Sequence, residues 1–229
     1  MSDAPFLIVE ILYPGLTQLD FTGPHTIFSR IPNTRTIVAS LRGGEVESDG
    51  GLFFARTAPL SEIERCDLLF LPGGLAATDV GNDPAFLAEV KRLAATARYL
   101  TSVCTGSLIL GAAGLLRGKR AACHWAWRDM LPLFGAIPDA GRVVRDGDII
   151  TGGGVTAGID FALTVAAELA GADVAQALQL GIEYCPAPPF DAGSPATAPA
   201  HLVTRFRERT RELLIRRCAA AERAMARLG

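Results

Sequence analysis

The stretch SVCTGSLIL, residues 102–110, decides the fold because it puts a thiol where a short apolar run gives way to a helical pattern. A free cysteine inside a strand is usually a small buried hydrophobic residue. At a strand-to-helix turn, Cys104 would instead project outward, as the side chain of a nucleophile elbow does. The unpaired N–H groups of the helix start favour an anion there, and they predict a thiolate with a lowered pKa.

On both sides of this turn, short apolar runs alternate with longer helical patterns. The predicted strands are FLIVEIL at 6–12, RTIVAS at 35–40, CDLLFLPGG at 66–74, RYLTSV at 98–103 and KRAACHW at 119–125. Alternation of this kind is typical of a parallel sheet between helical layers. The sequence therefore predicts an α/β fold: a doubly wound, mostly parallel, flavodoxin-like sheet with helices on both faces and a nucleophile elbow.

Turn signals and helical periodicity predict the remaining elements. Hairpins are expected where Asp-Gly turns join short strands, at 45–57 and 142–154. Helices are expected at 19–31, with Pro24 in the first turn, and at 83–97, 107–116, 155–171, 173–184 and 201–228. The Pro- and Ala-rich run 185–200 suits no regular element. We expect one domain over 1–229, with its core at about 6–190 and a connection and terminal helix at 191–229.

Composition excludes several classes of protein. The 229 residues are 49% apolar and 20% charged with a net charge of -2, which is typical of a globular protein and offers no basic surface for nucleic acid. No apolar run approaches the roughly 20 residues of a membrane helix, and the first strand has no basic leader of a signal peptide. Five widely spaced cysteines form neither a disulfide framework nor a metal-ligand pair. We expect a cytoplasmic protein that binds no metal, membrane or nucleic acid.

The fold would bring three distant loops to one edge of the sheet. In the flavodoxin-like order the first, third and fourth α/β strands are neighbours, and ligands bind beyond their carboxyl ends. The loops there are 13–20, 72–74 and 104–106. A carboxylate, a thiol and glycine amides are therefore expected to converge on one site for a small molecule.

Two side chains compete as the partner of Cys104. Asp20 lies between Leu19 and Phe21, a poor place for a carboxylate without a role, although it could also cap a helix. An ionised aspartate would raise the thiol pKa, so the useful form is a protonated Asp20 hydrogen-bonded to a thiolate. His124 either approaches Cys104 from the side or is simply packed or capping.

At these residues the sequence resembles the ThiJ/PfpI superfamily, which shares its fold with class I glutamine amidotransferases. The resemblance runs from about residue 6 to residue 190. It is carried by FLPGG at 70–74, VCTGSLILGAAGLLRGKRAACHW at 103–125 and TGGGVTAGIDFAL at 151–163. More narrowly, LTQLDFTGPHTIF at 16–28, the Cys-Thr-Gly elbow and EYCPAPPF at 183–190 resemble the isocyanide (isonitrile) hydratases.

That resemblance implies a chemistry and a set of roles. It makes Cys104 the nucleophile and Asp20 its proton partner, with the amides of Thr105 and Gly74 as backbone donors beside Gly73. It implies hydration of an isocyanide to an N-substituted formamide, without a cofactor, in a homodimer.

Other activities of the superfamily remain open alternatives. Thr105, in place of a histidine after the nucleophile, argues against a protease, and no late His-x-Glu pair supports an amidotransferase. The same Cys104 could serve a glyoxalase-like or deglycase reaction on methylglyoxal-type carbonyls, although such relatives typically use glutamate where Asp20 stands. An oxidation sensor or regulator is the non-enzymatic alternative, because exposed low-pKa thiols are also oxidised readily.

Overall fold

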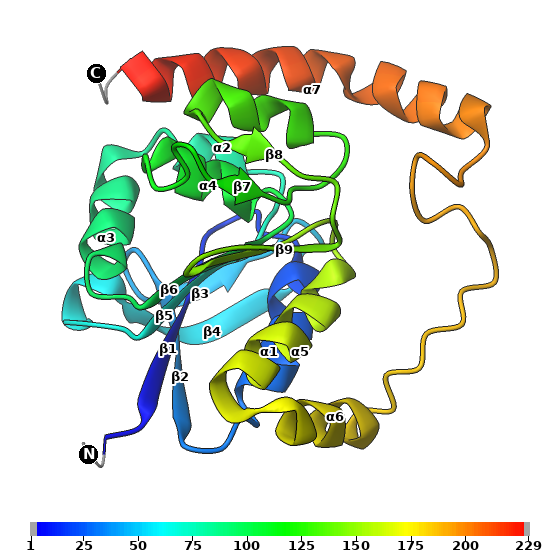
Figure 1. Cartoon of the computed structure of the whole chain (residues 1–229). Helices are drawn as coiled ribbons and strands as arrows, with labels where there is room; N and C mark the ends of the chain where they lie inside the picture. The colour runs from blue at the N-terminus through cyan, green and yellow to red at the C-terminus, as the bar shows by residue number, and fades with distance from the viewer. Residues whose placement is uncertain (1–3, 227–229) are drawn as a thin grey trace.

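The structure, a computed structural model, describes residues 4–226 and centres on one eight-stranded sheet (Figure 1). The strand order is β3-β4-β2-β1-β5-β6-β10-β9, and only the two outermost pairs, β3-β4 and β10-β9, are antiparallel. The strands are β1 Phe6–Leu12, β2 Thr34–Ser40, β3 Gly44–Glu47, β4 Phe53–Pro59, β5 Leu68–Leu71, β6 Tyr99–Val103, β9 Val143–Asp146 and β10 Ile149–Gly152. The predicted mostly parallel sheet and both hairpins are confirmed.

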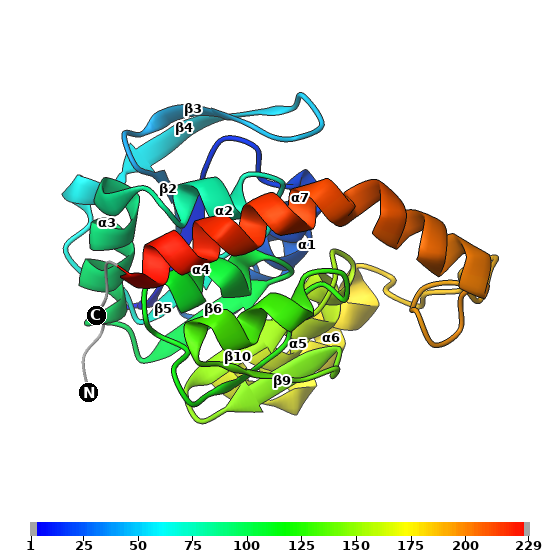
Figure 2. The ribbon, with the colours of Figure 1, turned by 90° about the horizontal axis from the view of Figure 1, so that it is seen from above.

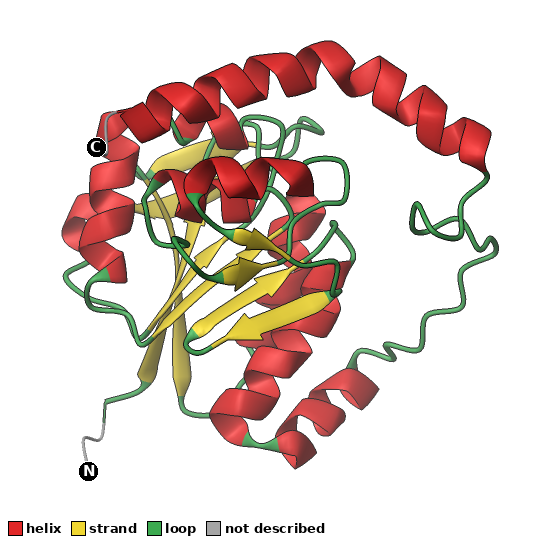
Figure 3. Cartoon of the chain, turned by 45° about the horizontal axis from the view of Figure 1, so that its top comes forward, coloured by secondary structure: helices red, strands yellow, loops and turns green. Residues whose placement is uncertain are grey.

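Helices cover both faces of this sheet (Figure 3). They are α1 Gln18–Phe28, α2 Ala77–Val80, α3 Pro84–Ala94, α4 Gly106–Ala112, α5 Ala157–Ala170, α6 Ala172–Gly181 and α7 Ala200–Ala226, with 3-10 helices at Leu60–Glu62 and Arg128–Phe134. Residues 1–3 and 227–229, which the expected 1–229 domain includes, lie outside the described residues.

Alternation along the strands builds a core on each face. Ile8 and Phe70 pack with α1 and α5, while their neighbours Val9 and Leu69 pack with α3 and α4. Successive strand residues point to opposite faces, so strands that are apolar throughout must be covered on both sides. This two-sided burial holds the carboxyl ends of β1, β5 and β6 together.

The position of Pro24 differs from the prediction. It lies in the middle of α1 rather than in its first turn, because the helix already begins at Gln18 after Thr17. A proline there removes one helical hydrogen bond. Its ring packs closely on Gly158 of α5, where an added Cβ would lie 3.1 Å from the proline ring. The earlier start puts Asp20 in the first turn of α1.

The predicted strand at 119–125 is largely wrong. Only β7, Arg120–Ala121, is extended, and it pairs with β8, Ile137–Pro138, in a separate two-stranded sheet. The chain does not continue as a strand because side chains replace strand partners for its backbone. The Ala122 N–H donates to Thr151 Oγ1, and the Ala122 carbonyl accepts from Ser107 Oγ.

The terminal helix α7 crosses over α2 and α4, and the connection 185–199 before it has no regular structure, as predicted (Figures 1 and 2). The two views also show that this connection and the first half of α7 stand away from the sheet. Within residues 4–226, none of the helices combines the length and apolarity that crossing a bilayer requires.

Candidate active site

Cys104 stands at a strained turn between β6 and α4. Its φ is +57°, in the left-handed region that costs a non-glycine residue on the order of 1–3 kcal/mol. Its backbone N–H donates to the carbonyl of Gly153 at 2.7 Å and to that of Gly152 at 3.1 Å. On the other side, a Cβ on Gly106 would collide with the Leu71 carbonyl oxygen, so the helix can start this close to β5 only with glycine. The predicted strand-to-helix elbow is confirmed, although Cys104 is buried, at 5% exposure, and does not project outward as expected.

Asp20 reaches the elbow from the first turn of α1. The residue is fully buried, and a Cβ built on Gly73 would lie 2.5 Å from its Oδ2 and 2.7 Å from Cys104 Cβ. Gly73 therefore leaves the gap through which carboxyl and thiol meet. The thiol and the Gly73 N–H both favour the charged form of Asp20, but neither makes a well-aligned hydrogen bond to it. Asp20 does not cap α1, since the N-cap position is Thr17.

Burial favours the protonated forms of both Asp20 and Cys104. It raises the pKa of Asp20 from 3.8 to about 7. Burial, followed by the charge of Asp20, also raises the pKa of the Cys104 thiol, and the Thr105 N–H opposes this only in part. The lowered thiol pKa expected from the helix start is thus wrong for the closed site, because loss of water outweighs the helix amides. At neutral pH the pair keeps at least one proton.

Thr105 and Gly74 are hydrogen-bonded to each other. The Gly74 N–H donates to Thr105 Oγ1 at 2.9 Å, and that hydroxyl donates back to the Gly74 carbonyl at 3.0 Å. The Thr105 N–H faces the sulfur. The Gly74 N–H, expected as a second donor to the reacting group, is therefore engaged with a side chain.

His124 lines the same hollow as Cys104 without making a hydrogen bond to it in the described part of the chain. Its Nδ1 accepts from the Ala126 N–H at 3.3 Å, so the imidazole is neutral with its proton on Nε2. Burial, with the charge of Arg217, lowers the His124 pKa and keeps that form. The ring stacks beside Trp125, which makes it a wall of the hollow.

The hollow in front of Cys104 holds about 370 Å³ and is partly formed by α7. Its walls are mostly apolar or aromatic, with two arginines. They include His124, Trp127, Val155, Phe206, Arg209, Leu213 and Arg217. Among residues 4–226 no group of three or more His, Cys, Asp or Glu side chains could hold a metal ion.

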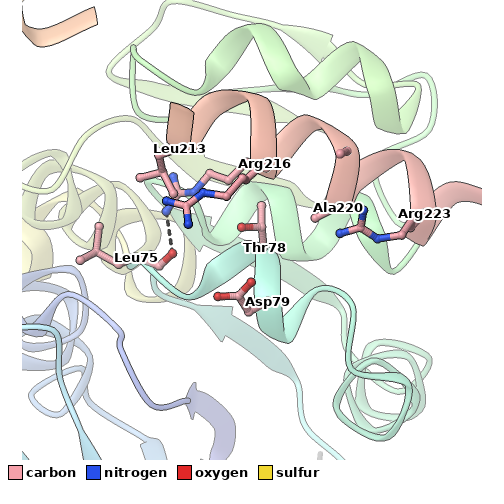
Figure 4. Close-up of a pocket in the computed structure, with 9 residues that line it drawn as sticks. Leu75, Thr78, Asp79, Leu213, Arg216, Ala220 and Arg223 are labelled. Atoms are coloured by element: carbon pink, nitrogen blue, oxygen red, sulfur yellow. Dashed lines mark hydrogen bonds between the residues drawn. The ribbon is translucent and has the colours of Figure 1, made fainter. Parts of the chain in front are cut away.

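Arg217 is the residue of this site that the sequence reasoning missed. It is 2% exposed, inside the apolar face that α7 turns toward the body. An adjoining hollow between α2 and α7, about 480 Å³ in volume, shares Leu75, Leu213 and Arg217 with the first one; Figure 4 shows Leu75 and Leu213 beside Thr78 and Arg216. The signal in the sequence was an arginine set among Leu213, Leu214 and alanines at helical spacing.

An open α/β sheet with a cysteine elbow and a buried acid beside it defines a class of protein, and residues 8–168 match the model of the DJ-1/PfpI family. The chain belongs to the DJ-1/PfpI family.

Within that family, the chain is 49% identical to the isonitrile hydratase of Pseudomonas putida, over 95% of this chain and 96% of that one. A solved ThiJ/PfpI family protein from Pseudomonas syringae is 44% identical and superposes with a TM-score of 0.90, covering 95% of this chain and 90% of its own. A DJ-1 superfamily protein from Salmonella typhimurium is 26% identical, with a TM-score of 0.71 over 80% of this chain and 100% of its own. The predicted resemblance and fold class are confirmed.

Proposed function

We propose that this protein is an isocyanide hydratase: it hydrates organic isocyanides to N-substituted formamides through a thioimidate on Cys104. The observation that carries the proposal is the buried Asp20 carboxyl beside the thiol, with a pKa of about 7. A group with that pKa can both give and take a proton at neutral pH. Similarity to the isonitrile hydratase of Pseudomonas putida along nearly the whole chain supports the same assignment.

The first half of the reaction needs one proton and one nucleophile. The thiol proton passes to Asp20, and the Cys104 sulfur attacks the terminal carbon of R–N≡C. Asp20 gives that proton to the same carbon as the C–S bond forms, which leaves the thioimidate R–N=CH–S on the enzyme. The proton held by the pair is thus consumed at the carbon, and Asp20 becomes a carboxylate.

The second half uses the carboxylate as a base. Asp20 takes a proton from water as the hydroxide adds to the thioimidate carbon, and this proton goes to the nitrogen. The hydroxyl proton of the adduct then leaves through Asp20 as C=O forms and C–S breaks. The thiol is restored and R–NH–CHO departs, so the sum is one isocyanide and one water to one formamide.

The walls of the hollow suit the R group. A volume of about 370 Å³ lies in the range of small-molecule pockets, roughly 300–1,000 Å³. Phe206, Trp127 and the neutral His124 offer flat apolar surface near the reacting carbon. Aromatic and cyclic alkyl isocyanides are the class that these walls favour.

The test is turnover of an aromatic and a cyclohexyl isocyanide, with the N-formamide followed by absorbance and mass spectrometry. Cys104→Ala and Asp20→Asn should both lose turnover. Cys185→Ala and Asp49→Asn are the matched controls because both side chains are exposed, and they should keep it. A thioimidate adduct trapped by acid quenching on the Cys104 peptide of the wild type, and absent from Asp20→Asn, would support the order of steps.

Other outcomes reassign the protein. Consumption of methylglyoxal in place of isocyanide would favour the glyoxalase-like or deglycase reaction on the same thiol. Inactivity toward both substrates, with ready oxidation of Cys104, would favour a sensor or regulator.

We further propose a cytoplasmic homodimer built from one domain over 1–229. All five cysteines lie in the described part of the chain as free thiols, which suits a reducing compartment. Phe190 in the connection and Ile215 on α7 are largely exposed, and a second copy could cover them. Sedimentation or light scattering gives the mass in solution, and a monomer would contradict the proposed dimer.

A further inference from the structure

A positive charge is buried in α7 without a negative partner of its own. Arg217 is 2% exposed, and none of the ion pairs in residues 4–226 includes it. A buried charge without a counter-charge destabilises the folded state. The protein therefore keeps this guanidinium at a cost, unless some nearby group carries the compensating charge.

The contacts of Arg217 hold it in place but do not neutralise it. Its Nη2 donates to the Leu75 carbonyl at 2.7 Å and to the Gly74 carbonyl at 3.4 Å. Its guanidinium lies 4.2 Å from the centre of the Trp127 ring. Nε and Nη1 are buried and have no hydrogen-bond partner in the described structure.

The negative charge that faces it is that of the reactive pair. Arg217 and Cys104 line the same hollow. The Gly74 carbonyl accepts from Arg217, and Gly74 is also hydrogen-bonded to Thr105, the residue after Cys104. Asp20 and Cys104 together hold one negative charge whenever they hold one proton, and Asp20 has no ion pair in residues 4–226 either. The buried Arg217 thus borders the same cavity as the thiol of a buried pair that carries a negative charge.

We propose that Arg217 is a positioning residue. Its positive charge stabilises the negative charge of the Asp20–Cys104 pair and so favours ionisation of Cys104 to the reactive thiolate. The guanidinium acts through the pair and needs no contact with the isocyanide. The inference rests on the proposed reactivity of Cys104 but not on the identity of the substrate.

Other titratable groups around the site do not supply this charge. Burial raises the pKa of Tyr13, in the loop after β1, and that of Cys123, after β7, so both side chains stay protonated and neutral. His124 is neutral, since its Nδ1 accepts a backbone N–H. On the far side of Arg217, Asp79 of α2 shares the adjoining hollow with the exposed Arg216 and Arg223. Arg209 of α7 also lines the hollow of Cys104, but it is exposed and lies over the Phe206 ring, so Arg217 is the buried cation on the Cys104 side.

The experiment is the pH dependence of Cys104 alkylation by iodoacetamide, read on the Cys104 peptide by mass spectrometry so that other thiols do not interfere. The main variant is Arg217→Gln, which keeps a donor for the Leu75 carbonyl and removes the charge. We expect the apparent pKa of alkylation to rise by about one unit, and the rate at low pH to fall about tenfold. Arg216→Gln is the matched control, because Arg216 lines only the adjoining hollow, and it should follow the wild type.

An unchanged alkylation profile in a folded Arg217→Gln variant would overturn the proposal. If that variant does not fold, Arg217→Lys decides, because it keeps the charge and loses the planar fork. A profile within about half a unit of the wild type supports a role of the charge, and a rise of a full unit overturns it. Isocyanide turnover is not part of this readout, so a failure of the proposed activity leaves it unaffected.

Discussion

The strongest test of the proposed proton carrier is a measurement of stability. Replacing Asp20 by asparagine keeps the shape of the side chain and removes its titration. Burial raises the pKa of Asp20 from 3.8 to about 7. Because the folded pKa lies above the unfolded one, protonation of Asp20 stabilises the folded state fully below about pH 3.8, and this contribution is lost as the pH rises through about 7.

The magnitude follows from the size of that shift. Between the two pKa values the folded state binds one proton more than the unfolded state, so the free energy of unfolding falls by about 1.4 kcal/mol per pH unit. From pH 5 to pH 7 this amounts to about 2 kcal/mol, because the slope has already halved at pH 7, and above pH 7 the loss levels off. The asparagine variant lacks this slope, so it should gain stability relative to the wild type by that amount while losing activity.

Urea unfolding of both proteins at pH 5, 6, 7 and 8 measures the difference. Subtracting the two curves removes every other titrating group that the substitution leaves untouched. Asp49→Asn serves as the control, because it removes a carboxylate from the same neighbourhood at an exposed position. A difference between wild type and Asp20→Asn that stays flat from pH 5 to pH 8 would refute the raised pKa, and with it the account of Asp20 as proton carrier.

Two further substitutions test the geometry of the site. Gly73→Ala should reduce kcat/KM by about 100-fold, because its Cβ would lie 2.5 Å from Asp20 Oδ2 and force the pair apart; Gly181→Ala, where an added Cβ meets nothing within 4 Å, should leave turnover intact. Phe206→Ala should raise the KM for aromatic isocyanides by about tenfold at constant kcat, since it removes a wall that binds ground and transition state alike. Leu202→Ala, exposed on the same helix, is its control, and equal effects of the two would contradict a role of Phe206 in binding.

The elements of the fold could be predicted from sequence wherever a local pattern of apolar residues determines the secondary structure. The apolar runs predicted β1, β5 and β6, and the flavodoxin-like strand order then placed Asp20 and Cys104 at one edge, as the structure has them. The strand expected at 119–125 failed because its backbone bonds go to Thr151 and Ser107, side chains far away in sequence. Tertiary hydrogen bonds of this kind leave no trace in a local pattern.

The electrostatics of the site could not be predicted from position alone. A cysteine at a helix start suggests a thiolate, yet the pKa of Cys104 is raised because the same turn buries it beside Asp20. Whether helix amides or loss of water prevails depends on how completely the pocket closes, which needs the packing of α1 and α7. The burial of Arg217 could not be predicted for a related reason. An arginine in a charged helix is normally exposed to solvent, and only its apolar neighbours on the same helix face indicate otherwise.

The loop of residues 73–75 links Asp20, the elbow and Arg217 into one site. The Gly73 carbonyl accepts from the Thr17 N–H at the start of α1, so the loop fixes the helix that carries Asp20. Gly74 exchanges two hydrogen bonds with Thr105, and the Leu75 carbonyl accepts from Arg217. Three successive residues thus set the acid, the elbow and the buried cation relative to one another, although these come from α1, the start of α4 and α7. A displacement of this loop would therefore move Arg217 relative to Asp20 and Cys104 and at the same time change the distance between Asp20 and Cys104. The short glycine loop, and not any one charged side chain, thus determines the geometry of the site.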